Sequence, residues 1–283
     1  MTSETVRASV NTYYNWSQPL YNLFWGASSH HCMHVGYSES GEDSLEASVE
    51  NLNAVLADEA GIDEGDRVLD AGCGVGGGSV WLATRRGASV LGININGQQL
   101  EQARSYADRE GVEDLVSFRL ADFTDTGLDS SSFDIVWAVD TVSHTDERRK
   151  FFQEAYRLLD ESGVLVLTDA FRETDDLDQE TRRKLRAVES GLGVQPWEMK
   201  ADYRQYADDA GFGEITFRDI TAEAKPSLER VYRRAKLARP LGVVASLLPL
   251  PDTIKDIPAS GYYQYQLVND GILSYQIMTC QVG

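Results

Sequence analysis

Residues 68 to 77 read Val-Leu-Asp-Ala-Gly-Cys-Gly-Val-Gly-Gly, and this stretch decides the fold. The apolar residues at its start predict a β-strand that ends at Asp70. The glycines that follow predict a tight turn, and Ser79 to Arg86 continue as a helix. A strand, a glycine turn and a helix in this order place a ligand at the helix N-terminus, where backbone N–H groups are available to bind it.

Two ligands compete for this turn. Gly72, Gly74 and Gly77 also match the Gly-x-Gly-x-x-Gly pattern of dinucleotide-binding turns. Asp70 distinguishes between the two possible ligands, because a carboxylate two residues before the first glycine would repel a pyrophosphate. S-adenosylmethionine has no phosphate, and its ammonium and sulfonium groups suit a nearby carboxylate. The turn therefore favours S-adenosylmethionine over a nicotinamide dinucleotide.

Four further apolar segments extend the pattern into a parallel sheet. They are Ala88–Asn94, Leu115–Leu120, Phe133–Val139 and Gly163–Thr168, with a helix predicted over Glu147–Leu159. Asn94 ends the second strand, where a ribose would lie beside the end of the first strand, and its amide can bind a diol. Asp122 and Phe123 follow the third strand. There a carboxylate can accept a hydrogen bond from an adenine amine, and a phenyl ring can cover the base.

Together these motifs resemble the class I S-adenosylmethionine-dependent methyltransferases. The resemblance spans roughly residues 45 to 170 and rests on Val68–Gly77, Gly92–Gln99, Leu120–Phe123, Phe133–His144 and Leu158–Leu167. It implies contacts with the methionine part from Asp70, Gly72 and Gly74, with the ribose from Asn94 and Gln99, and with adenine from Asp122 and Phe123. Cys73, within the turn, completes the predicted cofactor site. Most members carry an acid at position 94, whereas some lipid-modifying members carry a neutral polar residue there and a glutamine five residues on.

The resemblance implies an α/β fold with a Rossmann-like sheet of seven mostly parallel strands in the order 3-2-1-4-5-7-6. The last strand is expected to be antiparallel, with helices on both faces and a helical cap. We predict the sixth strand over Glu214–Ile220 and the last over Ile272–Val282. The expected divisions are an aromatic-rich lid (1–43), a cofactor-binding core (44–170), a helical cap insertion (171–213) and the last strands (214–283) with an apolar cap segment (222–262).

The composition limits the domain organisation, the substrate class and the cell compartment that we expect for the protein. The 283 residues suit one large domain with a cap. The net charge of −19 argues against a nucleic-acid substrate, because the phosphate backbone would be repelled. We see no apolar run long enough to span a membrane and no signal peptide, which leaves transient contact with a membrane surface open. Three widely spaced cysteines indicate a reducing cytoplasm, and nothing indicates an oligomeric state.

We expect the residues that select the methyl acceptor to lie outside the cofactor-binding core. Residues 11 to 37 are dense in aromatic residues and hold three of the four histidines. We expect this segment to pack on the sheet and to close as a lid. The predicted acceptor-binding residues are Tyr14, Tyr21, Trp25 and His30 from the lid, and Trp197 from the cap insertion. Leu241–Leu250 is either a buried part of the cap or an exposed apolar lip that admits a lipid-like substrate.

A narrower resemblance lies within the lid. The pattern Tyr21-x3-Trp25-Gly26-x-Ser28-x-His30, followed by His34-x2-Tyr37, is similar to the start of the sterol and tocopherol C-methyltransferases. It is also similar to the start of some small-amine N-methyltransferases. Both groups have an aromatic stretch with Trp-Gly and then His ahead of the cofactor core.

Methyl transfer is an in-line displacement, and the protein mainly supplies alignment and excludes water. An amine nucleophile must lose a proton, whereas an alkene carbon leaves a carbocation that aromatic faces stabilise and a base quenches. The predicted bases are His144, Asp140 and His34, with His30 and His31 as further candidates. His144 is favoured because a histidine pKa suits proton transfer near neutral pH. No cluster of residues indicates a metal site.

We therefore predict a small-molecule methyltransferase with S-adenosylmethionine as its cofactor. A hydrophobic, isoprenoid-type acceptor methylated at carbon is favoured, because the aromatic residues and the apolar cap segment fit it. A small amine such as a glycine derivative is the second candidate, and a cyclic or phenolic oxygen is the third. Outside methyl transfer, a nicotinamide oxidoreductase and a catalytically silent S-adenosylmethionine-binding module stay open.

Overall fold

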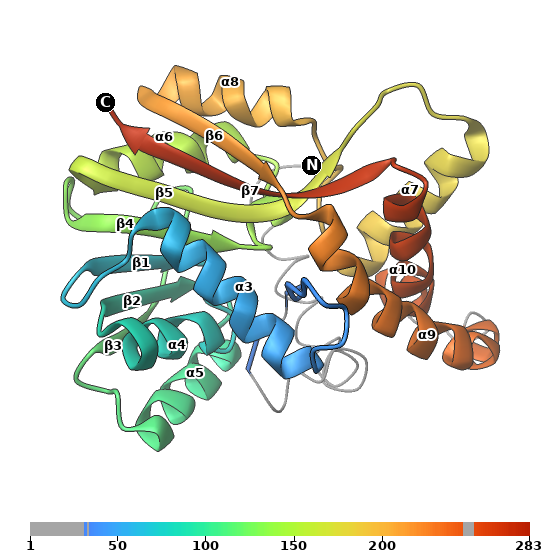
Figure 1. Ribbon diagram of the computed structural model, residues 1–283, viewed down its shortest axis with the longest axis horizontal. Helices are drawn as coiled ribbons and strands as arrows, with labels where there is room; N and C mark the ends of the chain where they lie inside the picture. Colours follow the sequence, from blue (N-terminus) through green and yellow to red (C-terminus); the bar gives the residue numbers. More distant parts are fainter. Residues whose placement is uncertain (1–30, 33, 246–251) are drawn as a thin grey trace.

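One mixed sheet organises the protein (Figure 1). The computed structural model describes residues 31–32, 34–245 and 252–283. Seven strands pair in the order β3-β2-β1-β4-β5-β7-β6. They are β1 (Arg67–Ala71), β2 (Ser89–Asn94), β3 (Val116–Leu120), β4 (Phe133–Val139), β5 (Leu159–Arg172), β6 (Phe212–Asp219) and β7 (Leu273–Val282). β1 to β5 are parallel, and β7 runs antiparallel to both β5 and β6, so the predicted strand order and reversed last strand are confirmed.

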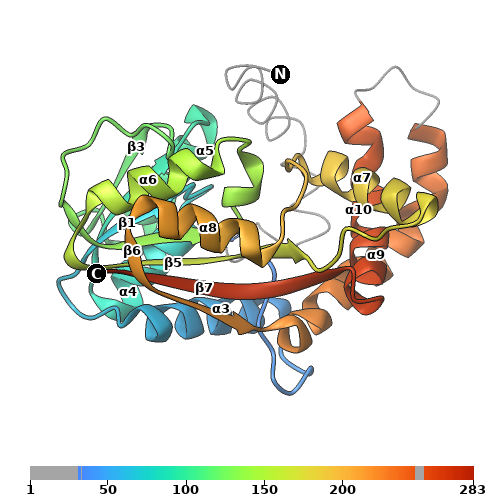
Figure 2. The same cartoon turned by 90° about the horizontal axis from the view of Figure 1, so that it is seen from above.

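Helices cover both faces of the sheet (Figure 2). On one face lie α3 (Leu45–Ala60) and α4 (Gly77–Arg86), and on the other lie α6 (Arg148–Leu158) and α8 (Lys200–Ala210), while α5 (Gly97–Glu110) packs beside β3 and α4. Successive strand residues point to opposite faces. Val68 of β1 therefore joins the core under α3 and α4, whereas Leu69 joins the core under α6. Both faces of the sheet are thus apolar and covered.

Three more helices gather at one end of the sheet. These are α7 (Gln179–Leu192), α9 (Thr221–Ala245) and α10 (Asp252–Asn269), and α7 and α9 each pack against α10. The Asp178 side chain caps α7 by accepting a hydrogen bond from the backbone N–H of Thr181. No helix in the described ranges is both long and apolar enough to cross a membrane. The division into lid, core and cap stays a prediction.

The carboxyl ends of β1, β4 and β5 meet at one edge of the sheet. Asp70 pairs in register with Trp137, and Val139 pairs with Thr168. Asp140 then leaves β4 with a left-handed φ of 47°, which turns the chain into the short 3-10 helix η1 (Val142–His144). Side chains from three distant parts of the sequence therefore converge where parallel sheets commonly bind ligands.

Candidate active site

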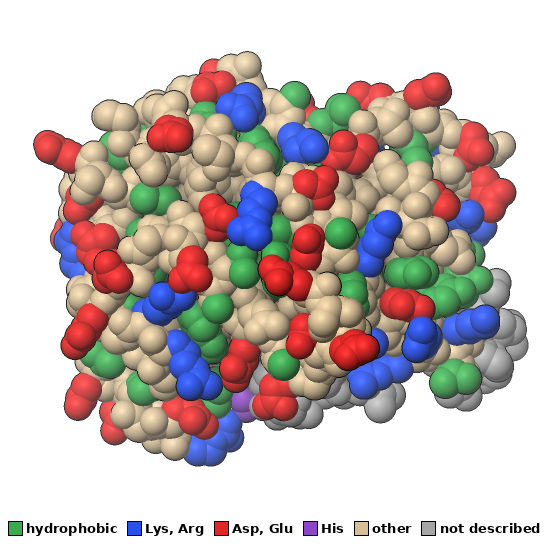
Figure 3. All heavy atoms as spheres, viewed as in Figure 1, with side chains coloured by type: hydrophobic (Ala, Val, Ile, Leu, Met, Phe, Trp, Pro, Cys, Tyr) green, Lys and Arg blue, Asp and Glu red, His purple; other side chains and the backbone are tan. Residues whose placement is uncertain are grey.

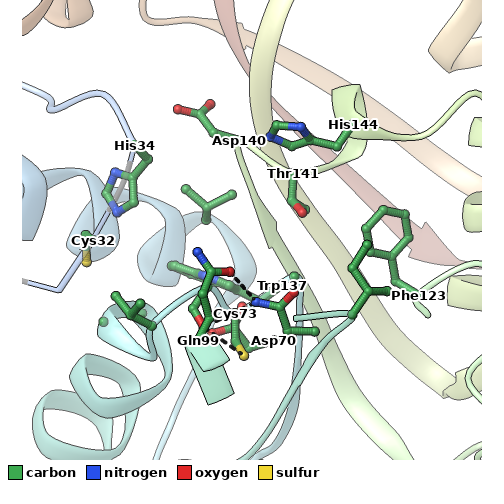
Figure 4. Close-up of a pocket in the computed structure, with 18 of the residues that line it drawn as sticks. Cys32, His34, Asp70, Cys73, Gln99, Phe123, Trp137, Asp140, Thr141 and His144 are labelled. Carbon is green, nitrogen blue, oxygen red and sulfur yellow. Dashed lines mark hydrogen bonds between the residues drawn. The ribbon is translucent and has the colours of Figure 1, made fainter. Parts of the chain in front are cut away.

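A large pocket opens at this edge of the sheet. It holds about 1040 Å³ of empty space, part of it open to solvent, which suits a cofactor together with an acceptor. All eight predicted cofactor residues line it: Asp70, Gly72, Cys73, Gly74, Asn94, Gln99, Asp122 and Phe123. The predicted bases His34, Asp140 and His144 also line it, and Figure 4 shows them on the side of the pocket opposite the glycine turn. The structure thus brings these residues together, and their roles are proposals.

Gly72 and Gly77 of the turn lie against other chain segments too closely for a side chain. A Cβ on Gly72 would lie 2.0 Å from the hydroxyl oxygen of Thr141, and Gly72 has a φ of 87°. A Cβ on Gly77 would lie 2.3 Å from the carbonyl oxygen of His31. That carbonyl accepts a hydrogen bond from the backbone N–H of Gly77 at 3.1 Å. The segment before the core therefore rests directly on the N-terminus of α4.

Asp70 is a buried carboxylate beneath the turn. Its Oδ2 accepts a hydrogen bond of 2.6 Å from the hydroxyl of Ser79 on α4. Burial raises the pKa of Asp70 to about 6, and the hydrogen bonds from Ser79 oppose that shift. An ionised carboxylate that has left water is stabilised by a nearby positive charge. Asp70 therefore fits the ammonium group of S-adenosylmethionine, as its position in the sequence predicts.

Asn94, at the end of β2, is hydrogen-bonded to Gln99 of α5, which Figure 4 labels in the pocket. The Asn94 Nδ2 donates to Gln99 Oε1 at 2.9 Å and to the carbonyl oxygen of Gly74 at 3.3 Å. The Asn94 Oδ1 accepts from the backbone N–H of Asn96 at 3.1 Å. Asn96 in turn caps α5, which holds Gln99 in its first turn. The pair thus presents amide groups to the pocket from a fixed frame.

Asp122 and Phe123 are held in the same way at the end of β3. The Asp122 Oδ1 accepts from the backbone N–H and the hydroxyl of Thr124, at 2.7 and 2.6 Å. Phe123 packs edge-on against Phe151 of α6, with ring centroids 5.5 Å apart. A carboxylate and an aromatic face at this place fit an adenine ring.

Asp140, directly after β4, and Asp169, within β5, form a pair of buried carboxyl groups. The Asp140 Oδ2 accepts from the backbone N–H of Val35 at 3.1 Å, and its Oδ1 is enclosed without a hydrogen-bond partner among the described residues. Asp169 accepts from the backbone N–H groups of Ser143 and Ala170, at 2.8 and 2.9 Å. Burial raises the pKa of Asp169 to about 6, and burial together with the Asp169 charge raises that of Asp140 well above its usual range. Asp140 is therefore the member that more readily carries a proton.

His144 is fixed by the cap. Its Nδ1 lies 2.9 Å from the carbonyl oxygen of Gly193, and because a carbonyl only accepts, Nδ1 must carry the proton. Burial lowers the pKa of His144 to about 4. The imidazole is therefore neutral near pH 7 and, with Nδ1 protonated, has its lone pair on Nε2.

Arg148 joins η1 to the loop that follows α7. This arginine is buried, and one of its nitrogens donates to the carbonyl oxygens of Ser143 and Pro196, at 3.3 and 3.0 Å. Its other terminal nitrogen lies 3.3 Å from a carboxylate oxygen of Glu198. The backbone N–H of Gln195 also donates to the Ser143 carbonyl at 2.8 Å. These bonds set the position of η1, and hence of His144.

Of the residues predicted to bind the acceptor, Trp197 lies within the described part of the chain. The prediction that Trp197 binds the acceptor is wrong. Its side chain is 3% exposed, packs in the main core and does not line the pocket. The loop that carries it folds inward, because the backbone N–H of Trp197 donates to the Glu189 carboxylate. His31 lines the pocket with its ring stacked on Tyr106 at 4.0 Å. His34 is buried, with Nδ1 2.7 Å from the carbonyl oxygen of Val35. Four predicted residues lie outside the described residues: Tyr14, Tyr21, Trp25 and His30.

Sequence reasoning missed other residues of the site. Lining residues that it did not single out include Asn53, Trp137 and Thr141. Asp169 could have been identified from the sequence, because it follows the predicted strand Gly163–Thr168 as Asp70 follows the apolar residues of the first strand. Arg148 could not have been identified in this way, because its partners Pro196 and Glu198 come from a distant loop. Within the part of the chain that is described, no group of three or more His, Cys, Asp or Glu side chains is arranged to hold a metal ion.

The sheet with its reversed seventh strand and the pocket over a glycine turn define a class I S-adenosylmethionine-dependent methyltransferase. Residues 69–167 match the family model described as a methyltransferase domain. Methyltransferase GfsG of Streptomyces halstedii is 31% identical over 237 residues, which cover 81% of this chain and 84% of that protein. The chain therefore belongs to the S-adenosylmethionine-dependent methyltransferase family, and S-adenosylmethionine is its cofactor.

Other similar proteins differ in what they methylate. Sterol 24-C-methyltransferase of Aspergillus fumigatus is 34% identical over 213 residues, or 74% of this chain and 54% of that protein, so the chain spans about half the length of this relative. The solved structure of geranyl diphosphate C-methyltransferase from Streptomyces coelicolor has a TM-score of 0.75 at 17% identity and covers 98% of both chains. A putative sarcosine dimethylglycine methyltransferase from Galdieria sulphuraria has a TM-score of 0.77 at 21% identity, covering 94% of this chain and 98% of that one. These two structures share the fold.

Proposed function

We propose that the protein transfers a methyl group from S-adenosylmethionine to an unsaturated carbon of a hydrophobic, isoprenoid-type acceptor. The observation that carries the proposal is a neutral, weakly basic His144 and the enclosed Asp140 carboxyl group on the same wall of the pocket (Figure 4). The similarity to the sterol and geranyl diphosphate C-methyltransferases supports carbon as the methylated atom.

The glycine-turn half of the pocket is assigned to the cofactor. Asp70 would hold the ammonium group, Asn94 and Gln99 the ribose hydroxyls, and Asp122 the adenine amine. When bound, S-adenosylmethionine supplies an electrophilic methyl group on a positively charged sulfur. The protein's task is to hold the acceptor carbon in line with that methyl group and to exclude water.

The weak basicity of His144 fits carbon methylation. As the acceptor double bond forms its new carbon–carbon bond, the carbon–sulfur bond breaks and a positive charge remains on the neighbouring acceptor carbon. A carbocation is a strong acid, so a base with a pKa of about 4 suffices to take the adjacent proton and restore a double bond. Ionised Asp140, on the same wall, would stabilise the positive charge before the proton leaves. His34, which also lines the pocket, is a third candidate base.

Methylation of a small amine is the second candidate, and the similarity in fold to the sarcosine dimethylglycine methyltransferase supports it. An ammonium group must lose its proton near neutral pH before it attacks. His144 is poorly matched to that task because its pKa is about 4. Asp140, whose pKa is raised well above its usual range, is better matched. An amine acceptor would therefore make Asp140 the base in place of His144.

The test is a labelled methyl transfer. Purified protein is incubated with S-adenosylmethionine labelled on its methyl group and a metabolite extract, and the products are divided between organic and aqueous phases. We expect label in the organic phase, and much less of it with His144→Gln. Label in the aqueous phase that survives His144→Gln but not Asp140→Asn would favour the amine. Cofactor binding without any labelled product would instead indicate a silent binding module.

We also propose a reducing, cytoplasmic setting. All three cysteines of the chain, Cys32, Cys73 and Cys280, are buried, and none of them forms a disulfide. Burial raises the pKa of Cys32 to about 12 and also raises that of the other two thiols, so all three stay protonated and unreactive. Buried thiols outside any disulfide support a compartment in which disulfides do not form.

A further inference from the structure

Glu189, near the end of α7, is an acid in an unusual place. Figure 3 shows Asp and Glu side chains spread over one face of the protein surface, as expected for a chain with a net charge of −19. Glu189 is buried instead, with only 8% of the residue exposed. Taking a carboxylate out of water costs free energy unless it is hydrogen-bonded or paired. The position of Glu189 therefore requires a partner, and that partner lies on the loop that follows α7.

Glu189 holds both ends of this loop. At the start of the loop, the backbone carbonyl of Glu189 accepts from the backbone N–H of Val194 at 3.0 Å. At its end, the Oε1 of the Glu189 carboxylate accepts from the backbone N–H of Trp197 at 3.1 Å. The side chain of Trp197 packs in the main core and anchors the same end. We call residues 193–197 the positioning loop.

Between these two attachments, the positioning loop contacts two consecutive residues of η1. The backbone N–H of Gln195 donates to the carbonyl oxygen of Ser143 at 2.8 Å. The carbonyl oxygen of Gly193 lies 2.9 Å from Nδ1 of His144. Gly193 has a left-handed φ of 67°, a conformation that glycine adopts readily. A short loop that is held at both ends keeps these two contacts in a fixed relation to each other.

The hydrogen bond between His144 and Gly193 decides which ring nitrogen can take a proton. A neutral imidazole carries one proton, and the hydrogen bond made by one nitrogen sets the state of the other. While Nδ1 donates to the Gly193 carbonyl, the lone pair is on Nε2. If that carbonyl moved away, the proton could pass to Nε2, and a nitrogen that already carries a proton cannot accept one. A displaced Gly193 would therefore remove the base without removing the imidazole.

We propose that Glu189 is a positioning residue for methyl transfer. By holding both ends of the positioning loop, it keeps the Gly193 carbonyl on His144 and so keeps the lone pair on Nε2. Glu189 is not among the described residues that line the pocket, so it acts on the reaction through the loop. Its effect on the rate rests on the role of His144 in the proposed function, whereas its effect on the imidazole does not.

The position of the proton on His144 can be measured without any acceptor. In protein with isotope-labelled histidine, proton–nitrogen correlation spectra distinguish a protonated ring nitrogen from one with a lone pair, and His144→Gln identifies the signal. We expect the proton on Nδ1 in the wild type near pH 7. Glu189→Leu fills a similar volume without an acceptor oxygen. It should move the proton to Nε2 in a large share of the molecules and lower kcat at least tenfold, with the KM for S-adenosylmethionine within about twofold.

Three further variants separate the hydrogen bond from charge and from stability. Glu189→Gln keeps an oxygen that can accept from Trp197, so the tautomer and kcat should stay within about twofold of the wild type. Glu180→Leu removes an exposed acid of the same helix, which pairs with Lys184 at 3.1 Å, and should change neither. Trp197→Phe keeps the backbone N–H but shrinks a core side chain. It should therefore lower the thermal stability without moving the proton.

Three results would overturn the proposal: a proton on Nε2 in the wild type, an unchanged tautomer in Glu189→Leu, or the same movement of the proton in Glu189→Gln as in Glu189→Leu. The first of these applies even where a variant does not fold. The proposed function is judged separately, from the phase in which the labelled methyl group appears. Label in the aqueous phase together with the expected tautomers would contradict carbon methylation and still support the positioning role of Glu189.

Discussion

The carboxyl group of Asp140 accepts a hydrogen bond from the backbone N–H of Val35, with 3.1 Å between oxygen and nitrogen. This bond connects the end of β4 to the segment that brings His34 into the pocket. One side chain therefore both holds a wall of the site and faces the acceptor space.

Two substitutions separate these roles of Asp140. Asp140→Asn keeps an oxygen that can accept from Val35 but removes the negative charge and the capacity to take a proton. We expect cofactor affinity within about twofold of the wild type and kcat lower by about 10²- to 10⁴-fold. Asp140→Ala also loses the bond to Val35 and should cost about 1–3 kcal/mol of folding free energy. Calorimetric titration and turnover assays check both, and a fully active Asn variant would leave Asp140 only a structural role.

The charge of Asp169 should set where activity falls at low pH. Only ionised Asp140 can stabilise a cation or accept a proton, so the rate should rise as pH increases through its raised pKa. Asp169→Asn removes the charge that helps to raise that pKa. The acid limb of the kcat profile should therefore move to lower pH, whereas the exposed-site control Asp175→Asn should leave it in place. A limb that does not move would show that another group controls the rate.

Cofactor affinity should depend on the protonation of Asp70. Its pKa of about 6 means that, as pH falls through 6, a proton competes with the cofactor's ammonium group for the carboxylate. The Kd for S-adenosylmethionine should therefore rise between roughly pH 7 and 5, where an α-ammonium stays protonated. Asp70→Asn should weaken binding by about 1–3 kcal/mol and abolish the pH dependence. The same pH dependence in wild type and Asp70→Asn would contradict the assigned contact.

The turn should not tolerate a methyl group at Gly72. In Gly72→Ala the new Cβ would overlap the Thr141 hydroxyl, and the φ of 87° adds strain of about 1–2 kcal/mol. We expect lower stability and cofactor binding weaker by tenfold or more. Adding Thr141→Ala should restore only part of the loss, since the Thr141 Cβ lies 2.9 Å from the position that the new atom would take. Gly97→Ala, at a position with open space, is the control and should be neutral in thermal unfolding and titration.

Removal of Arg148 should destabilise the protein more than removal of its neighbour Arg149. Arg148→Met removes the buried cation that faces the Glu198 carboxylate and donates to the Ser143 and Pro196 carbonyls, which should cost about 3 kcal/mol. Arg149 is exposed and pairs with Asp209, so Arg149→Met should cost less than about 1 kcal/mol. Urea unfolding of the two variants provides the comparison, and similar midpoints would mean that the buried network contributes little.

Most of the sheet, and the gathering of the proposed cofactor residues around one pocket, could be predicted from the sequence, because both depend on local patterns. Short apolar runs fix the parallel strands, and parallel strands bring their carboxyl ends to one edge. Asp70, Asn94 and Asp122 follow such runs directly, so their shared position in the pocket follows from their place in the sequence.

Features that depend on long-range pairing could not be read in this way. The apolar run predicts that β5 ends at Thr168, but the strand continues to Arg172 because antiparallel pairing with β7 extends to the Arg172–Leu273 pair. Trp197 looks like a pocket residue in a loop, yet its loop folds into the core around Glu189. In both cases the deciding partner lies on another element, and no local pattern identifies it.

The place of β7 between β5 and β6 has a consequence for biosynthesis. β6 lies at the edge of the sheet, and its neighbour is made more than fifty residues later. A nascent chain can pair β1 to β5 as they emerge, but β6 must wait for β7 with its backbone polar groups unpaired. Until residues 273–282 leave the ribosome, β5 and β6 each expose an unprotected edge that can pair with other chains. Translation that stalls within α10 should therefore yield a product prone to aggregation.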